Sequence, residues 1–176
     1  MIITISGKQG AGKTSVGKEL AKRLGYKFIS IGELRGEIAT EKGLTIDELN
    51  KIGERESWAH KEADKKTIEI GKTKDNFIIE GWIAYHFIQN SKKIFLEVSE
   101  KIGAERIFND QRKDEPYCKT IEEMQKLLKN RLNETYAQFK KYYKINFLDK
   151  SQYDIEINTT NLSINETADK LLKFLK

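Results

Sequence analysis

Gly7-Lys8-Gln9-Gly10-Ala11-Gly12-Lys13-Thr14 lies between a short apolar run, Ile2 to Ser6, and an amphipathic segment that ends near Leu24. The stretch has the spacing G-x-x-x-x-G-K-[ST], in which glycines let successive backbone N–H groups point at phosphate oxygens. A glycine-rich turn with an incidental lysine is the alternative, which the strand and helix patterns on either side disfavour. The stretch therefore predicts a phosphate-binding loop at the end of a buried strand.

The residues of this loop have separate chemical roles. Lys13 supplies charge to the β- and γ-phosphates, and the Thr14 hydroxyl is a ligand for Mg²⁺. The helix that follows adds the positive end of its dipole. The nucleotide-binding residues predicted from the motif are Gly7, Lys8, Gln9, Gly10, Ala11, Gly12, Lys13, Thr14 and Ser15.

The chain of 176 residues has the length of one domain and the composition of a soluble globular protein. Hydrophobic residues make up 38% and charged residues 34%, and no apolar run approaches the roughly 20 residues that a membrane span needs. Its single cysteine, Cys118, excludes an intramolecular disulfide and a multi-thiolate zinc site. We expect a cytoplasmic protein without a membrane partner.

A net charge of +5 suits anionic partners such as phosphates or nucleic acid. Much of the excess is lysine dispersed among glutamates along predicted helices, which is typical of a solvated helix face. The lysines do not cluster with interleaved aromatic residues, so we do not expect nucleic-acid binding.

Strand and helix patterns alternate along the sequence. The strands are predicted at residues 2–6, 27–30, 77–80, 93–98 and 153–158. The helices are predicted at residues 14–24, in a polar block between 32 and 71, at 99–112, at 120–143 and from 163 onward. Within the polar block, Thr45 and Glu48 form a capping-box pattern that starts a new helix after Gly43, and Thr120 with Glu123 starts the long helix in the same way. This alternation predicts an α/β fold of three layers, in which helices flank a five-stranded parallel sheet.

Further motifs follow the loop in a fixed order. They are the segment Ser30-Ile31-Gly32-Glu33-Leu34-Arg35, an all-helical insert, a strand that ends in Glu80-Gly81, and the stretches 142–146 and 158–163. In this order the chain resembles the nucleoside monophosphate kinases, and most of all the archaeal-type cytidylate kinases, over essentially its full length. The resemblance implies one P-loop kinase domain, 1–176, with an acceptor-binding insert at about 32–71 and a helical, metal-free lid at about 106–139.

The resemblance also implies roles for single residues. Glu80 is expected near the Mg²⁺ that Thr14 binds. Trp82 either stacks on the acceptor base or packs the insert onto the sheet, and packing is slightly favoured. For Arg112, an ordinary surface role is nearly as plausible as a catalytic one. The implied catalytic residues are Lys13, Arg106, Arg112 and Arg131, and the implied acceptor-binding residues are Ser30, Gly32, Glu33, Arg35, Asp64, Gly81 and Trp82.

The implied activity is transfer of the γ-phosphoryl group of ATP, with Mg²⁺, to CMP or dCMP by a monomeric enzyme. The chain departs from the family pattern at Gly36, Trp82 and Gln138, where the family has arginine. These departures remove positive charge that phosphoryl transfer uses. Two alternatives therefore stay open, a regulatory nucleotide-binding protein with weak or no kinase activity and a kinase for another small acceptor.

Overall fold

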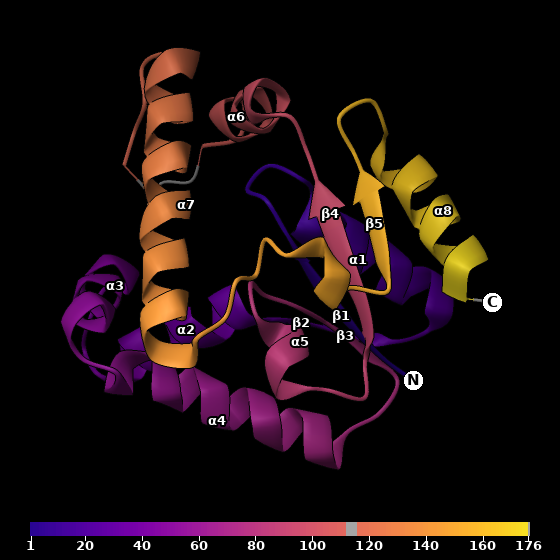
Figure 1. Ribbon diagram of the computed structural model, residues 1–176, viewed down its shortest axis with the longest axis horizontal. Coiled ribbons are helices and arrows are strands. Elements are labelled where there is room, and N and C mark those ends of the chain that lie inside the picture. The colour runs from indigo at the N-terminus through magenta and orange to yellow at the C-terminus, as the bar shows by residue number, and fades with distance from the viewer. Residues whose placement is uncertain (112–115, 176) are drawn as a thin grey trace.

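A five-stranded parallel sheet forms the centre of the computed structural model, which describes residues 1–111 and 116–175 (Figure 1). The strands are β1 (Ile2–Gly7), β2 (Lys27–Ser30), β3 (Phe77–Glu80), β4 (Lys92–Glu97) and β5 (Ile155–Asn158). Their order is β2-β3-β1-β4-β5, and all neighbours pair in parallel. The predicted α/β fold is confirmed.

Eight α-helices occur in the described ranges, and side-chain caps begin several of them. They are α1 (Lys13–Leu24), α2 (Ile31–Glu41), α3 (Ile46–Arg55), α4 (Trp58–Thr73), α5 (Ala84–Phe87), α6 (Glu100–Phe108), α7 (Ile121–Tyr143) and α8 (Ile164–Leu175). Thr45 caps α3 in a capping box with Glu48, and the Thr120 side chain accepts a hydrogen bond from the backbone of Glu123 at the start of α7. Both helix starts lie where the sequence pattern predicted them.

The central strand is buried on both faces because helices cover both sides of the sheet. Ile3 and Ile5 point into a core that includes residues of α1 and α8. Ile2 points the other way and packs with Phe77 and Ala84 beneath α4 and α5. This alternation fixes the register of β1 and therefore the place where the phosphate-binding loop leaves the sheet.

Helix α7 stands beside the sheet and contacts different elements with its two halves (Figure 1). Its first half buries Met124 and Leu128 against Ala104 of α6. Its second half buries Phe139 in an aromatic cluster with Tyr85 and Phe147. The long helix therefore connects the α6 side of the molecule with the helices α2 to α4.

The end of one helix and the start of the last strand were predicted wrongly, β4 lies one residue earlier than predicted, and one helix was missed. The helix predicted to reach Arg112 ends at Phe108, because the chain turns and the Gln111 side chain pairs with both backbone groups of Cys118; Arg112 itself lies outside the described residues. The last strand begins at Ile155 rather than at residue 153, because a 3-10 turn at 150–152 precedes it. Helix α5 has only four residues, too few for a periodic pattern.

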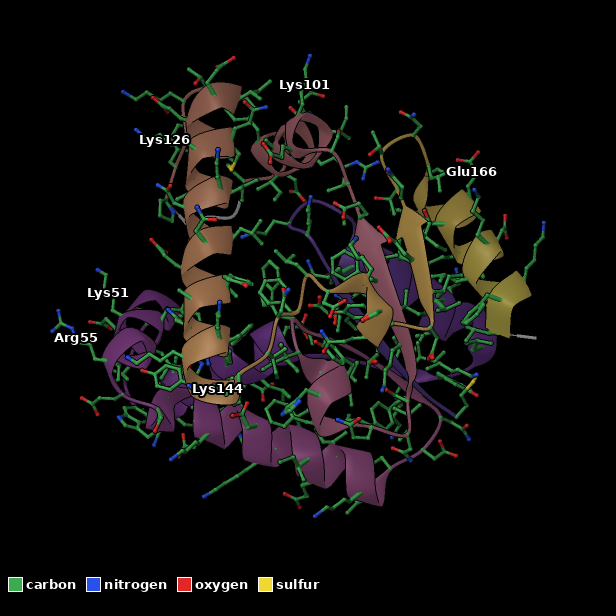
Figure 2. All side chains as sticks on the ribbon, viewed as in Figure 1. Lys51, Arg55, Lys101, Lys126, Lys144 and Glu166 are labelled. Atoms are coloured by element: carbon green, nitrogen blue, oxygen red, sulfur yellow. The ribbon has the colours of Figure 1, made fainter. Side chains whose placement is uncertain are left out.

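Charged side chains on the outer helices project away from the body of the molecule. Figure 2 shows this for Lys51 and Arg55 on α3, Lys101 on α6 and Lys126 on α7, all of which are exposed. These side chains agree with the prediction that much of the excess charge lies on solvated helix faces. Over the ranges that the structure covers, none of the helices has the length and apolar character to cross a bilayer.

Candidate active site

The three central strands end at one edge of the sheet, and the phosphate-binding loop lies there between two carboxylates. Ile5 of β1 is opposite Glu80 at the end of β3, and Gly7 is opposite Leu96, which precedes Glu97 at the end of β4. In open parallel sheets, ligands bind at the carboxyl ends of the strands, at the point where successive connections lead to opposite sides of one strand. Here that strand is β1, because β2 and β3 lie on one side of it and β4 and β5 on the other.

The loop has a backbone path that only glycine allows at two positions. Gly10 has φ 73°, and a Cβ built there would lie 2.3 Å from the carbonyl oxygen of Gly103. A Cβ on Gly7 would lie 2.2 Å from the carbonyl oxygen of Leu96. Gly12, at the N-cap of α1, brings no capping side chain, which leaves the first-turn N–H groups of the helix for phosphate oxygens.

Lys13 is positioned by the loop itself. Its Nζ donates a hydrogen bond to the backbone oxygen of Lys8 at 2.9 Å and lies 5.1 Å from the centre of the Trp82 ring. Burial lowers the pKa of the Lys13 amine, and the nearby Glu80 charge partly offsets this effect. The amine is therefore a desolvated group at the edge of the sheet. A phosphate oxygen would replace the Lys8 backbone oxygen as its hydrogen-bond acceptor.

Glu80 is buried and gathers two hydroxyl groups. Its Oε1 accepts hydrogen bonds from Ser30 Oγ at 2.6 Å and from Thr14 Oγ1 at 3.4 Å. Hydroxyl and carboxylate oxygens are the ligands that Mg²⁺ prefers, usually together with substrate phosphates. Among the described residues no group of three or more His, Cys, Asp or Glu could hold a metal ion. Thr14 and Glu80 therefore fit Mg²⁺ that arrives with a nucleotide.

Arg106, predicted as a lid arginine, braces the loop. Its guanidinium donates to the backbone oxygens of Gly10 at 3.2 Å, Thr159 at 2.8 Å and Leu162 at 3.3 Å. The Thr159 hydroxyl in turn donates to the backbone oxygen of Ala11 at 3.1 Å. Arg106 thus ties α6 to the phosphate-binding loop and to the connection between β5 and α8.

The other predicted lid residues lie on α7, apart from Arg112. Arg131 is half-buried there and precedes Leu132, which lines a cavity of about 50 Å³ between α7 and the phosphate-binding loop. Gln138 lies two turns further along the same helix. The lining residues of this cavity are Lys8, Gln9, Val98, Glu100, Gln125, Leu128, Lys129 and Leu132.

On the insert side, Arg35 is held by neutral groups. Its guanidinium donates to the Ala59 backbone oxygen at 3.0 Å and to Asn50 Oδ1 at 2.9 Å, and Nη1 lies 3.4 Å from His60 Nδ1. Burial lowers the pKa of Arg35, and the Asp64 carboxylate partly offsets this. These contacts orient the guanidinium without neutralising its charge.

Asp64 joins the insert to the end of α7. Its Oδ2 accepts a hydrogen bond of 2.5 Å from the Tyr143 hydroxyl. Burial raises the pKa of Asp64 to about 6, against the lowering effects of this hydrogen bond and of Arg35. Sequence reasoning did not identify Tyr143 as the partner of Asp64, although it lies in the 142–146 stretch that contributed to the resemblance.

The remaining predicted acceptor residues surround the end of β3. Ser30 accepts a hydrogen bond from the Glu33 backbone at 3.3 Å, so one side chain both caps α2 and contacts Glu80. Gly32 and the Glu33 side chain are exposed in the first turn of α2, and Glu33 forms a loose ion pair with Lys18 at 3.7 Å. The structure therefore places the Glu33 carboxylate toward α1.

Gly81 and Trp82 continue from the buried strand into the site. The Gly81 N–H donates to the Ile5 backbone oxygen at 3.0 Å, and a Cβ there would lie 2.6 Å from the Ile31 side chain. The Trp82 ring meets Phe147 edge-on with a centroid distance of 5.0 Å, while it also faces Lys13. Trp82 thus packs in an aromatic cluster with residues of α7 and of the segment that follows it, rather than with the insert, and lies beside Lys13 of the loop.

Replacing Asp64 by Asn should remove a pH-dependent part of the stability. Because the pKa of Asp64 is raised from 3.8 to about 6 in the folded protein, the stability that protonated Asp64 contributes is present below pH 3.8 and is lost as the pH rises through about 6. The unfolding free energy of the variant relative to the wild type should therefore increase between about pH 4 and about pH 7.

Urea unfolding at several pH values measures this difference. Asp110→Asn, at an exposed position, is the matched control and should keep a constant difference from the wild type. If the unfolding free energies of Asp64→Asn and the wild type change with pH in the same way, the assignment of this titration to Asp64 is wrong.

Comparison with known proteins agrees with this geometry. The model of the cytidylate kinase-like family matches residues 2–161. A cytidylate kinase from Saccharolobus islandicus is 38% identical over 99% of this chain and 90% of its own length, and one from Methanocella arvoryzae is 34% identical over 91% and 88%. An S-adenosylmethionine-dependent nucleotide dehydratase from Lacinutrix mariniflava is 31% identical over 97% of this chain, but the match covers only 35% of that protein.

Solved structures agree with the fold. A shikimate kinase from Bacteroides thetaiotaomicron superposes with a TM-score of 0.69 over 99% of this chain and 98% of its own, at 19% identity. Identity this low supports the P-loop kinase architecture alone. The family match covers nearly the whole chain and includes the loop, the insert and the β3 edge, and so the chain belongs to the cytidylate kinase-like family.

Proposed function

We propose that this protein is a nucleoside monophosphate kinase that transfers the γ-phosphoryl group of ATP to CMP or dCMP. The observation that carries the proposal is the convergence of Lys13 with the Thr14, Ser30 and Glu80 group at one sheet edge, directly beside a helical insert that presents Arg35. Phosphoryl transfer is catalysed mainly by positioning and positive charge, which this arrangement supplies.

The chain holds the donor with its backbone and the acceptor with its insert. N–H groups of the loop and of the first turn of α1 bind the β- and γ-phosphates, and Lys13 bridges them. Thr14 and Glu80 would hold Mg²⁺, which supplies positive charge beside the phosphates when it is bound. An ionised oxygen of the acceptor phosphate forms a new bond to the γ-phosphorus of ATP. At the same time the bond between the γ-phosphorus and the bridging oxygen of the β-phosphate breaks, and ADP leaves. No general base is required, because that oxygen carries no proton to remove.

The acceptor side of the proposal rests on the helices α2 to α4, which span the predicted insert at 32–71. Arg35 is partly buried and oriented by neutral acceptors, so that its charge is available to the acceptor phosphate. The names of the relatives support a nucleotide acceptor, since two are cytidylate kinases and the third acts on nucleotides. We propose that the lid includes the end of α6 and the first half of α7, which lie within the predicted 106–139 range.

A coupled assay of ADP release with CMP, dCMP, UMP, AMP and GMP tests this function. We expect CMP or dCMP to give the highest kcat/KM, and the Lys13→Ala variant to give none above background. Release of ADP that no monophosphate increases would contradict the kinase assignment and favour a regulatory nucleotide-binding protein. A preference for AMP or GMP would contradict the proposed acceptor while leaving the phosphotransferase intact.

A further inference from the structure

Lys8 is a second cation of the phosphate-binding loop, and its ammonium forms an ion pair with a carboxylate at the end of a strand. Its Nζ lies 2.7 Å from Glu97 Oε1, at the end of β4. The other oxygen of Glu97 lies 2.6 Å from the Nζ of Lys150, which also pairs with Glu156 at 2.5 Å. Lys150 is fixed in turn over the ring of Phe95 at 3.8 Å.

This arrangement allows Lys8 to leave without stranding a charge. Burial raises the pKa of Glu97, but hydrogen bonds from Lys150 and Lys8 outweigh it, and the pKa is lowered overall. A partly buried, ionised carboxylate that loses its last charged partner destabilises the folded protein. Because Lys150 keeps its own contact with Glu97, departure of Lys8 leaves the carboxylate paired.

The backbone of Lys8 is anchored while its side chain has room to move. The Lys8 N–H donates to the Leu96 backbone oxygen at 3.0 Å, and the Lys8 oxygen accepts from Lys13. The Lys8 side chain also lines the cavity between the loop and α7 together with Gln9. The flexible four-carbon stem of lysine lets the ammonium change partners by rotation about its side-chain bonds.

Arg106 is less free to serve the phosphates. Its guanidinium already donates to backbone oxygens of Gly10, Thr159 and Leu162, and its departure would unbrace the loop that binds the nucleotide. Lys8, by contrast, holds a partner that has a second cation. Of these two cations, Arg106 braces the loop from α6, whereas Lys8, in the loop itself, can be released.

We propose that Lys8 is a catalytic residue whose ammonium moves from Glu97 to the γ-phosphate of bound ATP, while Lys150 retains Glu97. The proposal rests on the proposed function in taking ATP as the donor. It assigns Glu97 and Lys150 as positioning residues that set how readily Lys8 is released.

Three substitutions with different expected effects on binding of an ATP analogue test the proposal. Lys8→Met should weaken binding of a nonhydrolysable ATP analogue with Mg²⁺ and lower kcat by about tenfold. Glu97→Gln, which frees Lys8, should leave analogue affinity unchanged or higher. Lys150→Met leaves Lys8 as the remaining partner of Glu97 in this ion network, so it should weaken analogue binding by about threefold. Lys101→Met, at an exposed position on α6, is the control and should behave as wild type.

A purely structural bridge gives a different pattern. If the Lys8 and Glu97 pair only braces the loop, Lys8→Met and Glu97→Gln should weaken analogue binding equally, and Lys150→Met should have no effect on it. Either result overturns the proposal. Urea unfolding of each variant identifies losses that come from destabilisation, and Lys8→Arg, which keeps the charge, should restore most of the affinity. If Glu97→Gln does not fold, Lys150→Met alone distinguishes the two patterns.

The binding arm of this experiment needs no acceptor, so it separates the two proposals. If no monophosphate is phosphorylated but the three variants bind the analogue as expected, the proposed function fails and the role of Lys8 as an ATP-binding cation remains supported. If CMP is phosphorylated and Lys8→Met is as active as wild type, the role of Lys8 is wrong and the proposed function stands.

Discussion

Replacement of Lys13 by alanine is expected to lower kcat/KM for CMP phosphorylation on the order of a thousandfold, because the variant loses a desolvated charge aimed at the transferred group. The amine donates to the Lys8 backbone oxygen and lies 5.1 Å from the centre of the Trp82 ring. Steady-state kinetics over a range of ATP and CMP concentrations measure the effect.

The same substitution should not unfold the protein. Burial lowers the pKa of the Lys13 amine, which means that the folded state desolvates this charge at a cost. The unfolding free energy of Lys13→Ala is therefore expected to equal or exceed that of the wild type. Lys22→Ala, on the exposed face of the same helix, is the matched control and should retain full activity. An active Lys13→Ala enzyme would refute the assigned site.

Gly10→Ala is expected to destabilise the protein by roughly 3 kcal/mol, the sum of a left-handed backbone conformation and a steric clash. The new Cβ would lie 2.3 Å from the backbone oxygen of Gly103 in α6, and neither backbone can move without breaking the Arg106 brace. We also expect a large loss of ATP affinity, because the displaced loop would no longer direct its N–H groups inward.

Gly12→Ala provides the matched comparison for that substitution. Gly12 has φ 83°, similar to the 73° of Gly10, but the nearest atom to its added Cβ is a Val16 side-chain carbon at 3.7 Å. It should therefore cost only the conformational part, about 1 to 2 kcal/mol. Urea unfolding of both variants isolates the contact with Gly103. Equal losses of stability would show that the close approach of the loop to α6 is not rigid.

The sequence predicted the donor half of the site because that half is local. The spacing from Gly7 to Thr14 determines the loop, and the pairing of parallel strands brings Glu80 beside it at the same edge of the sheet. The capping side chain Thr45 similarly marked the start of α3 from sequence alone. These features depend on neighbours in sequence or on the regular geometry of parallel strands.

Other contacts depend on how distant segments return to the site. Arg106 matched a lid arginine in the sequence, but it binds Thr159, 53 residues away, because the connection after β5 passes over the loop. The hydroxyl of Tyr143, the last residue of α7, donates to Asp64, which lies 79 residues earlier in the sequence. No periodicity or spacing encodes such pairs. Glu97 gave one usable signal, a carboxylate near the end of the strand predicted at residues 93–98.

The most direct test of the kinase assignment follows the phosphoryl group itself. ATP labelled at the γ-phosphate is incubated with Mg²⁺, CMP and the enzyme, and the products are separated. We expect the label to leave ATP and to appear in CDP in amounts equal to the ADP formed. Label found in inorganic phosphate, with none in CDP or in any other nucleoside diphosphate across the acceptor panel, would contradict the account.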